Sequence, residues 1–129
     1  MKKYPLIFIM LILAVVSPAF SQKQISKQQL EKGKTLAAAC ITCHATTEAV
    51  LADPLQRIRK IRPAGYIYAL MKNPMQFADE NKTAKKVFAK RGLQMPAFAN
   101  LSKAEINAIL DYFDSLPYNA NNYKDRIKN

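Results

Sequence analysis

The apolar residues near the C-terminal end of the chain recur with the spacing of a single helix face. They lie at i, i+3, i+4, i+7 and i+10, as Ile106, Ile109, Leu110, Phe113 and Leu116. Ser102 and Glu105, just before this run, have the residue types and spacing of a capping box. Pro117 follows the run and cannot continue a helix. The pattern predicts an amphipathic helix that begins at Ser102 and ends before Pro117.

A second helical pattern leads from Ser26 toward Cys40. Ser26 and Gln29 again have capping-box spacing. A narrow stripe of mostly small residues follows at helical spacing, namely Leu30, Gly33, Ala37 and Cys40. Because glycine destabilises a helix interior by about 0.5–1 kcal/mol relative to alanine, Gly33 indicates close approach of another helix.

The central part of the chain divides at its prolines. Asp53-Pro54-Leu55 breaks any helix, and a basic loop leads to Pro63, which suits the first position of a helix. The apolar face of this helix is Tyr66, Ile67, Leu70 and Met71, and Asn73-Pro74 ends it. Asn81 is the expected N-cap of a helix over Lys82 to Arg91, stopped by Gly92, with residues 93–98 as a loop. Since no strand pattern occurs, the sequence predicts an all-α fold.

The N-terminal segment has the composition of a secretory signal. A basic start, Met1-Lys2-Lys3, precedes eleven apolar residues from Leu6 to Val16, and small residues then lead to Ser21. The apolar run is well short of the roughly 20 residues that a membrane-spanning helix requires. We therefore predict a signal peptide over residues 1–21, a periplasmic location, one domain over residues 22–117 and a flexible polar tail over residues 118–129.

The candidate chemistry is concentrated in Cys40-Ile41-Thr42-Cys43-His44. These are the only cysteines and the only histidine in the chain. Two thiols separated by two residues and followed at once by histidine are typical of covalent c-type haem attachment. On one helical turn both sulfurs can form thioethers with the haem vinyl groups, and the histidine then lies under the iron. This is the favoured interpretation.

Three other interpretations of the motif are weaker. A zinc site needs four ligands, and the chain has only three Cys or His groups. A thioredoxin-like dithiol would follow a strand, whereas a helix pattern precedes Cys40. A disulfide between Cys40 and Cys43 would close too small a loop to stabilise much.

The order of these elements resembles the class I, monohaem cytochrome c domain over roughly residues 26–117. The resemblance rests on a first helix running into C-x-x-C-H, a proline soon after, a loop Met95-Pro96 and a final helix. It implies that the carbonyl of Pro54 accepts the Nδ1–H of His44, and that Tyr112 packs on Gly33. Two features depart from the family pattern: Ala45 replaces the common glycine after the histidine, and the chain has no Trp. The haem propionates would then need another partner among Arg57, Arg59, Arg62, Tyr66 and Tyr68.

One haem c, bound through Cys40 and Cys43, has His44 as its expected proximal iron ligand. The distal ligand is a choice among Met71, Met75 and Met95, and the resemblance favours Met95. His/Met ligation raises the reduction potential and fills both axial positions, so it favours electron transfer without a small-molecule substrate. The alternatives are a cytochrome subunit of a dehydrogenase or oxidase complex, and a haem-based sensor or small haem enzyme with an open axial position.

The formal net charge is +11, which falls to +9 when Lys2 and Lys3 leave with the signal peptide. The cations gather in two groups, over residues 57–62 and 82–91. A plain solvated surface is one interpretation. The other is electrostatic steering toward an acidic redox partner such as a respiratory oxidase, reductase or dehydrogenase. An anionic membrane surface is a second candidate for peripheral association, whereas an exported haem protein is not expected to bind nucleic acid.

Overall fold

The computed structural model describes residues 25–44, 51–92 and 94–118, and within these ranges the chain is helical with no strand. The elements in order are α2 (Lys27–Ile41), the 3₁₀ turn η1 (Ile58–Lys60), α3 (Ala64–Lys72), α4 (Pro74–Glu80), α5 (Lys82–Arg91) and α6 (Lys103–Ser115). The predicted signal peptide, and all of the predicted tail except Tyr118, lie outside the described residues. In the described part, no helix is long and apolar enough to cross a membrane.

Helix α6 forms as its sequence pattern predicts. Both hydrogen bonds of the capping box are present: Glu105 N donates to Ser102 Oγ, and the Glu105 carboxylate accepts from Ser102 N. The face predicted to be apolar is buried at Ile106, Ile109, Leu110 and Phe113. The helix ends at Ser115, and its C-cap residue Leu116 directly precedes Pro117. The final helix is therefore confirmed in its bounds, its cap and its buried face.

Helix α2 is also confirmed, but its capping box is only half formed. Ser26 Oγ accepts a hydrogen bond from Gln29 N at 3.1 Å. The Gln29 amide does not return to the Ser26 backbone; it donates to the carboxylate of Asp111 on α6. The side chain instead donates its amide N–H to a buried carboxylate on the neighbouring helix, which is a charge-assisted hydrogen bond.

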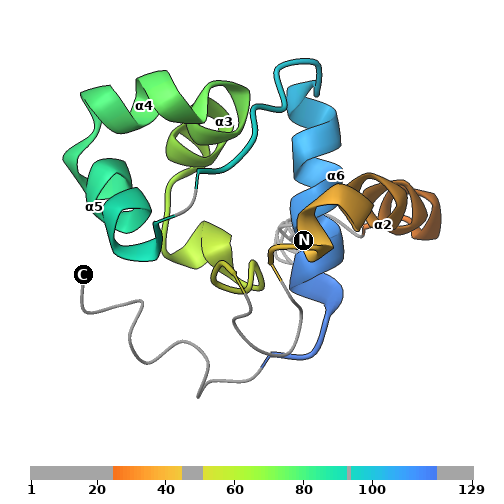
Figure 1. The fold of residues 1–129 in the computed structure, drawn as a ribbon. Coiled ribbons are helices and arrows are strands. Elements are labelled where there is room, and N and C mark those ends of the chain that lie inside the picture. Colours follow the sequence, from red (N-terminus) through yellow and green to blue (C-terminus); the bar gives the residue numbers. More distant parts are fainter. Residues whose placement is uncertain (1–24, 45–50, 93, 119–129) are drawn as a thin grey trace, which may run out of the picture.

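Helices α2 and α6 cross in close contact (Figure 1). A Cβ added at Gly33 would lie 2.0 Å from the carbonyl oxygen of Ala108 and 3.1 Å from Tyr112 Cβ. No side chain fits at that distance, so the crossing requires glycine. The predicted pairing of Gly33 with Tyr112 is confirmed, with the Ala108 backbone as the nearer contact.

The three helices α3, α4 and α5 form a separate arm, drawn in green beside the crossing (Figure 1). Pro63 has extended backbone and is the N-cap of α3, whose first helical residue is Ala64. The predicted start at Pro63 is therefore wrong by one residue. Asn73-Pro74 ends α3 as predicted, but Pro74 also begins α4, a helix that the sequence pattern did not predict. Proline suits the first helical position, where no N–H is needed, and Asn73 Oδ1 caps Gln76 N. For α5, the predicted cap at Asn81 and stop at Gly92 (φ 64°) are confirmed.

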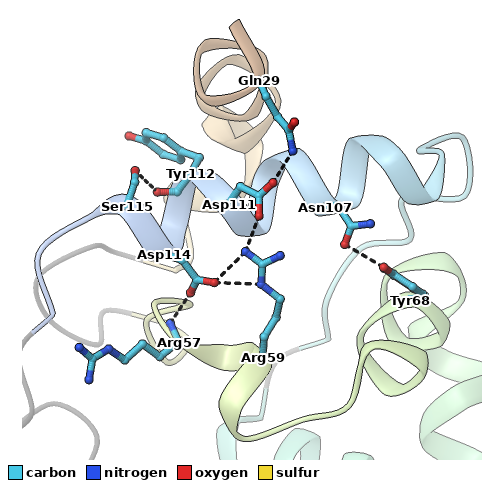
Figure 2. A network of polar contacts seen from close by, with 9 residues as sticks. All are labelled: Gln29, Arg57, Arg59, Tyr68, Asn107, Asp111, Tyr112, Asp114 and Ser115. Carbon is cyan, nitrogen blue, oxygen red and sulfur yellow. Dashed lines mark hydrogen bonds and ion pairs between the residues drawn. The ribbon is translucent and has the colours of Figure 1, made fainter. Parts of the chain in front are cut away.

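A polar network ties α6 to α2 and to the η1 turn (Figure 2). Asp111, whose side chain is 5% exposed, accepts from Arg59 Nη2 at 2.6 Å and from Gln29. Asp114 accepts from Arg59 Nε at 2.9 Å and from the backbone N–H of Arg57 at 2.8 Å. Partial burial lowers the pKa of Arg59, but its bonds to the two carboxylates outweigh this and raise it. The network fixes the chain directly before α3.

Candidate functional site

A cavity of about 520 Å³ lies between the end of α2, the segment 51–62, helices α3 and α5, the loop 94–98 and α6. Its size falls within the roughly 300–1,000 Å³ of small-molecule and cofactor sites. Most of its wall is apolar, and every residue predicted on the apolar face of α3 lines it, namely Tyr66, Ile67, Leu70 and Met71. The few polar groups in the wall are the candidates for chemistry.

The C-x-x-C-H motif lies on this wall. Helix α2 ends at Ile41, but Cys43 N and His44 N both bond to the Cys40 carbonyl, at 3.2 and 2.8 Å, and continue the turn. Cys40, Cys43 and His44 all line the cavity, and the two thiols are free rather than joined in a disulfide. Burial, and to a lesser extent the neighbouring Cys43, raises the pKa of the Cys40 thiol.

The ring of His44 is oriented by a backbone carbonyl. Its Nδ1 lies 2.6 Å from the carbonyl oxygen of Asp53. A carbonyl can only accept, so Nδ1 carries the proton and Nε2 is the nitrogen suited to bind a metal. The predicted acceptor, Pro54, is the next residue and is fully buried. The prediction is thus wrong by one residue, because the chain turns so that the carbonyl before the proline faces the ring.

The structure separates the three candidate methionines. Met75 on α4 is 46% exposed and does not line the cavity. Met71 and Met95 both line it. Met71 is buried in the main core, while Met95 is partly buried against that core. The loop that carries Met95 is held to α3 by a hydrogen bond from Phe98 N to the Met71 carbonyl, at 2.8 Å.

Arg62 and Tyr66 are the predicted propionate partners that reach the cavity. The Arg62 guanidinium carbon lies 5.3 Å from the Tyr66 ring centroid. Burial raises the pKa of Tyr66, against the opposing charge and hydrogen bond of Arg62. The others are engaged elsewhere: Arg59 with two carboxylates, Arg57 over the Tyr118 ring, and Tyr68 with Asn107.

The end of α5 and the loop after it contribute Lys90, Arg91 and Gln94 to the same cavity. From the sequence, the two cations were predicted only as part of a basic cluster. Residue spacing could not have placed them at the cavity, because their position depends on how α5 packs against α4.

The cytochrome c family model matches residues 30–117. The chain belongs to the cytochrome c family. A search of curated proteins found no match. Among solved structures, a cytochrome c from Rhodothermus marinus is similar, with a TM-score of 0.61 and 27% identity over 70% of this chain and 78% of that one.

The cytochrome c domain accordingly has the class I fold that was predicted, and the family supports a haem-based electron-transfer protein that binds haem c covalently. The cavity fits that cofactor in its own right. Two free thiols and an oriented imidazole lie on one wall, the thioethers of Met71 and Met95 line the same cavity, and the remaining surface is largely apolar. This donor set matches the His and Met ligands that iron porphyrins use in cytochromes c.

Proposed function

We propose that the protein is an exported monohaem cytochrome that transfers single electrons in a respiratory chain, with His44 and Met95 as the axial ligands of its iron. The observation that supports this most is the shared cavity. Cys40, Cys43, His44 and Met95 come from segments more than fifty residues apart along the chain, and all of them line it.

Each of these residues has a distinct task. Cys40 and Cys43 would hold the cofactor through thioether bonds, and the backbone carbonyl of Asp53 keeps the His44 ring in one orientation and tautomer. The thioether of Met95 is a poor donor to Fe(III), so this ligand raises the reduction potential. When bound, haem c supplies an iron that cycles between Fe(II) and Fe(III). If His44 and Met95 both held the iron, no position on it would remain for a substrate.

Arg62 and Tyr66 are the groups we propose for the haem carboxylates. A guanidinium donates two parallel hydrogen bonds to a carboxylate, and the phenol of Tyr66 is a further donor in the same wall. This pair would replace the Trp that the chain lacks.

The basic surface supports an acidic redox partner. Lys82, Lys85 and Lys86 are exposed on α5, and Lys90 and Arg91 at its end line the cavity. Helix α5 contains no acidic residue. Positive charge is therefore concentrated beside the site of electron exchange, where it would raise the encounter rate with an acidic oxidase, reductase or dehydrogenase. The same charge would favour peripheral contact with an anionic membrane.

The axial ligand is tested with Met95→Ala and its matched control Met75→Ala. Loss of Met95 should open the iron, lower the reduction potential and let the reduced protein bind carbon monoxide, while Met75→Ala should leave spectrum and potential unchanged. An unaltered spectrum in Met95→Ala would assign the ligand to Met71. Carbon monoxide binding by the unmodified reduced protein would instead favour a haem-based sensor or small haem enzyme.

Electrostatic steering is tested with a small anionic redox complex as the reactant. Its electron-transfer rate with the protein should exceed that of a neutral complex at low salt, and this excess in rate should disappear at high salt. Lys86→Glu should reduce the excess, whereas Lys27→Glu, on α2 and outside the cavity wall, should have little effect. Equal effects of the two substitutions would mean that the basic residues of α5 form a solvated surface and do not steer the reactant.

A further inference from the structure

Asp53 makes two contacts that point in different directions. Its backbone carbonyl accepts from His44 Nδ1 at 2.6 Å, and its carboxylate accepts from Arg91 Nη2. The residue before a proline is restricted to extended backbone, so Pro54 limits how Asp53 can move. In addition, Ala52 N donates to the Cys43 carbonyl at 3.0 Å. The carbonyl that orients His44 thus lies in a tightly restrained stretch of chain.

Arg91 reaches this stretch from the end of α5. It is the last residue of α5, where Gly92 turns the chain with left-handed backbone and its N–H bonds to the Phe88 carbonyl at 2.9 Å. Helix α5 packs chiefly on α4. Among the described residues, the Arg91–Asp53 pair is the ion pair that joins α5 to the loop holding His44. Lys90, beside it on the same wall, makes no ion pair in this part of the structure.

We propose that Arg91 is a positioning residue for His44, acting through Asp53. The ion pair fixes the Asp53 side chain, and with it the peptide whose carbonyl holds the imidazole ring. Partners of this kind set the orientation and basicity of a metal-bound histidine. The inference rests on the proposed function, in which His44 is the proximal iron ligand.

The direct measurement is hydrogen exchange of the His44 Nδ1–H, followed by NMR in the reduced, diamagnetic holoprotein. Because the Arg91 and Asp53 side chains are 36% and 31% exposed, the pair is partly screened by water. Such pairs are worth up to about 1 kcal/mol, so Arg91→Gln should speed exchange about two- to five-fold. Arg91→Lys, which keeps the charge but loses the planar fork, should give an intermediate rate.

Three comparisons distinguish positioning from a general effect. Asp53→Asn should speed exchange to a similar extent, and the double variant should be no faster than either single one. Lys90→Gln, which removes the neighbouring charge, should leave the rate unchanged. Added salt should speed exchange in the unmodified protein but not in Arg91→Gln.

Three results would overturn the inference. The exchange rate could be unchanged in Arg91→Gln, or Lys90→Gln could raise it as much as Arg91→Gln does. In the double variant, the increase could equal the product of the two single-variant increases. The optical spectrum is recorded first on the same sample. A red protein with unaltered exchange refutes the role of Arg91 alone, whereas protein that carries no haem refutes the proposed function together with the inference that rests on it.

Discussion

The α2–α6 crossing and the α3–α5 arm are held together in different ways. In the crossing, helices of 15 and 13 residues meet backbone against backbone at Gly33. They also share a buried apolar face and a polar network centred on Asp111. In the arm, the helices have 9, 7 and 10 residues. Isolated helices shorter than about 12–15 residues are marginal in water.

The arm also directs much of its apolar surface to the cavity instead of to protein. Ile67, Leu70 and Met71 of α3 and Val87 and Phe88 of α5 line its wall. Ile67 and Met71 are already buried in the main core, whereas Leu70, Val87 and Phe88 are only partly buried and would gain further burial from the bound cofactor. We therefore expect the arm to depend on bound haem more strongly than the crossing does.

The largest effect should come from preventing haem attachment. In a Cys40→Ala/Cys43→Ala variant, the cooperative melting transition should be lost, with amides of α3 to α5 losing hydrogen-exchange protection before those of α2 and α6. Thr42→Ala, at the exposed position between the cysteines, is the control and should melt normally. Equal loss of hydrogen-exchange protection in the crossing and in the arm would contradict the claim that the arm depends more on haem.

Gly33→Ala should destabilise the holoprotein by about 3 kcal/mol or more, because the added methyl would meet backbone atoms of Ala108 and overpack the crossing. A Cβ added at Gly65 in α3 would meet no atom within 4 Å. Gly65→Ala should therefore stabilise, by about 0.4–1 kcal/mol. Denaturant unfolding measures both. A mild effect at Gly33 would mean that the helices are not in close contact.

Asp111→Asn should cost about 1.5–3 kcal/mol, because it weakens hydrogen bonds between a buried carboxylate and both Arg59 and Gln29. Asp114→Asn, with a side chain 29% exposed, should cost less than about 1 kcal/mol. Urea midpoints of the two variants give the comparison. Equal losses would show that burial does not decide the strength of this network.

The smallest effect concerns the helix caps. Ser102→Ala should cost about 1 kcal/mol, and more than Ser26→Ala, since only Ser102 has a complete box. The backbone N–H and hydroxyl of Ser102 lower the pKa of Glu105. The stability from this bond is present above the usual carboxyl pKa of 4.5 and is lost as the pH falls through the lower folded value. Melting curves between pH 6 and acid should show this loss, and Ser102→Ala, which keeps the backbone N–H but loses the hydroxyl, should show less of it.

Sequence patterns predicted the helices more completely than they predicted the contacts of the site. Caps and apolar spacing located α2, α5 and α6, because those signals are local. Asn73-Pro74 was interpreted only as a stop, since the same residues that end one helix can begin the next, and α4 was missed. Asp111 gave no signal because its partners Gln29 and Arg59 lie 82 and 52 residues away.

In the site, the motif could be identified from the chain, and the family resemblance singled out Met95 among the methionines; both line the cavity. The contacts around them could not be predicted. The acceptor for His44 was placed at Pro54 and lies at Asp53, a difference set by local backbone direction. The proposal of Arg62 over Arg57 and Arg59 follows from which of the three lines the cavity. Such outcomes depend on tertiary contacts rather than on residue spacing.

The central claim, covalent haem at Cys40 and Cys43, is tested most directly by the absorbance spectrum and intact mass of protein recovered from cells with an active haem-attachment machinery. We predict a red protein whose mass exceeds that of the polypeptide by one haem. Colourless protein with the mass of the polypeptide alone would contradict the account.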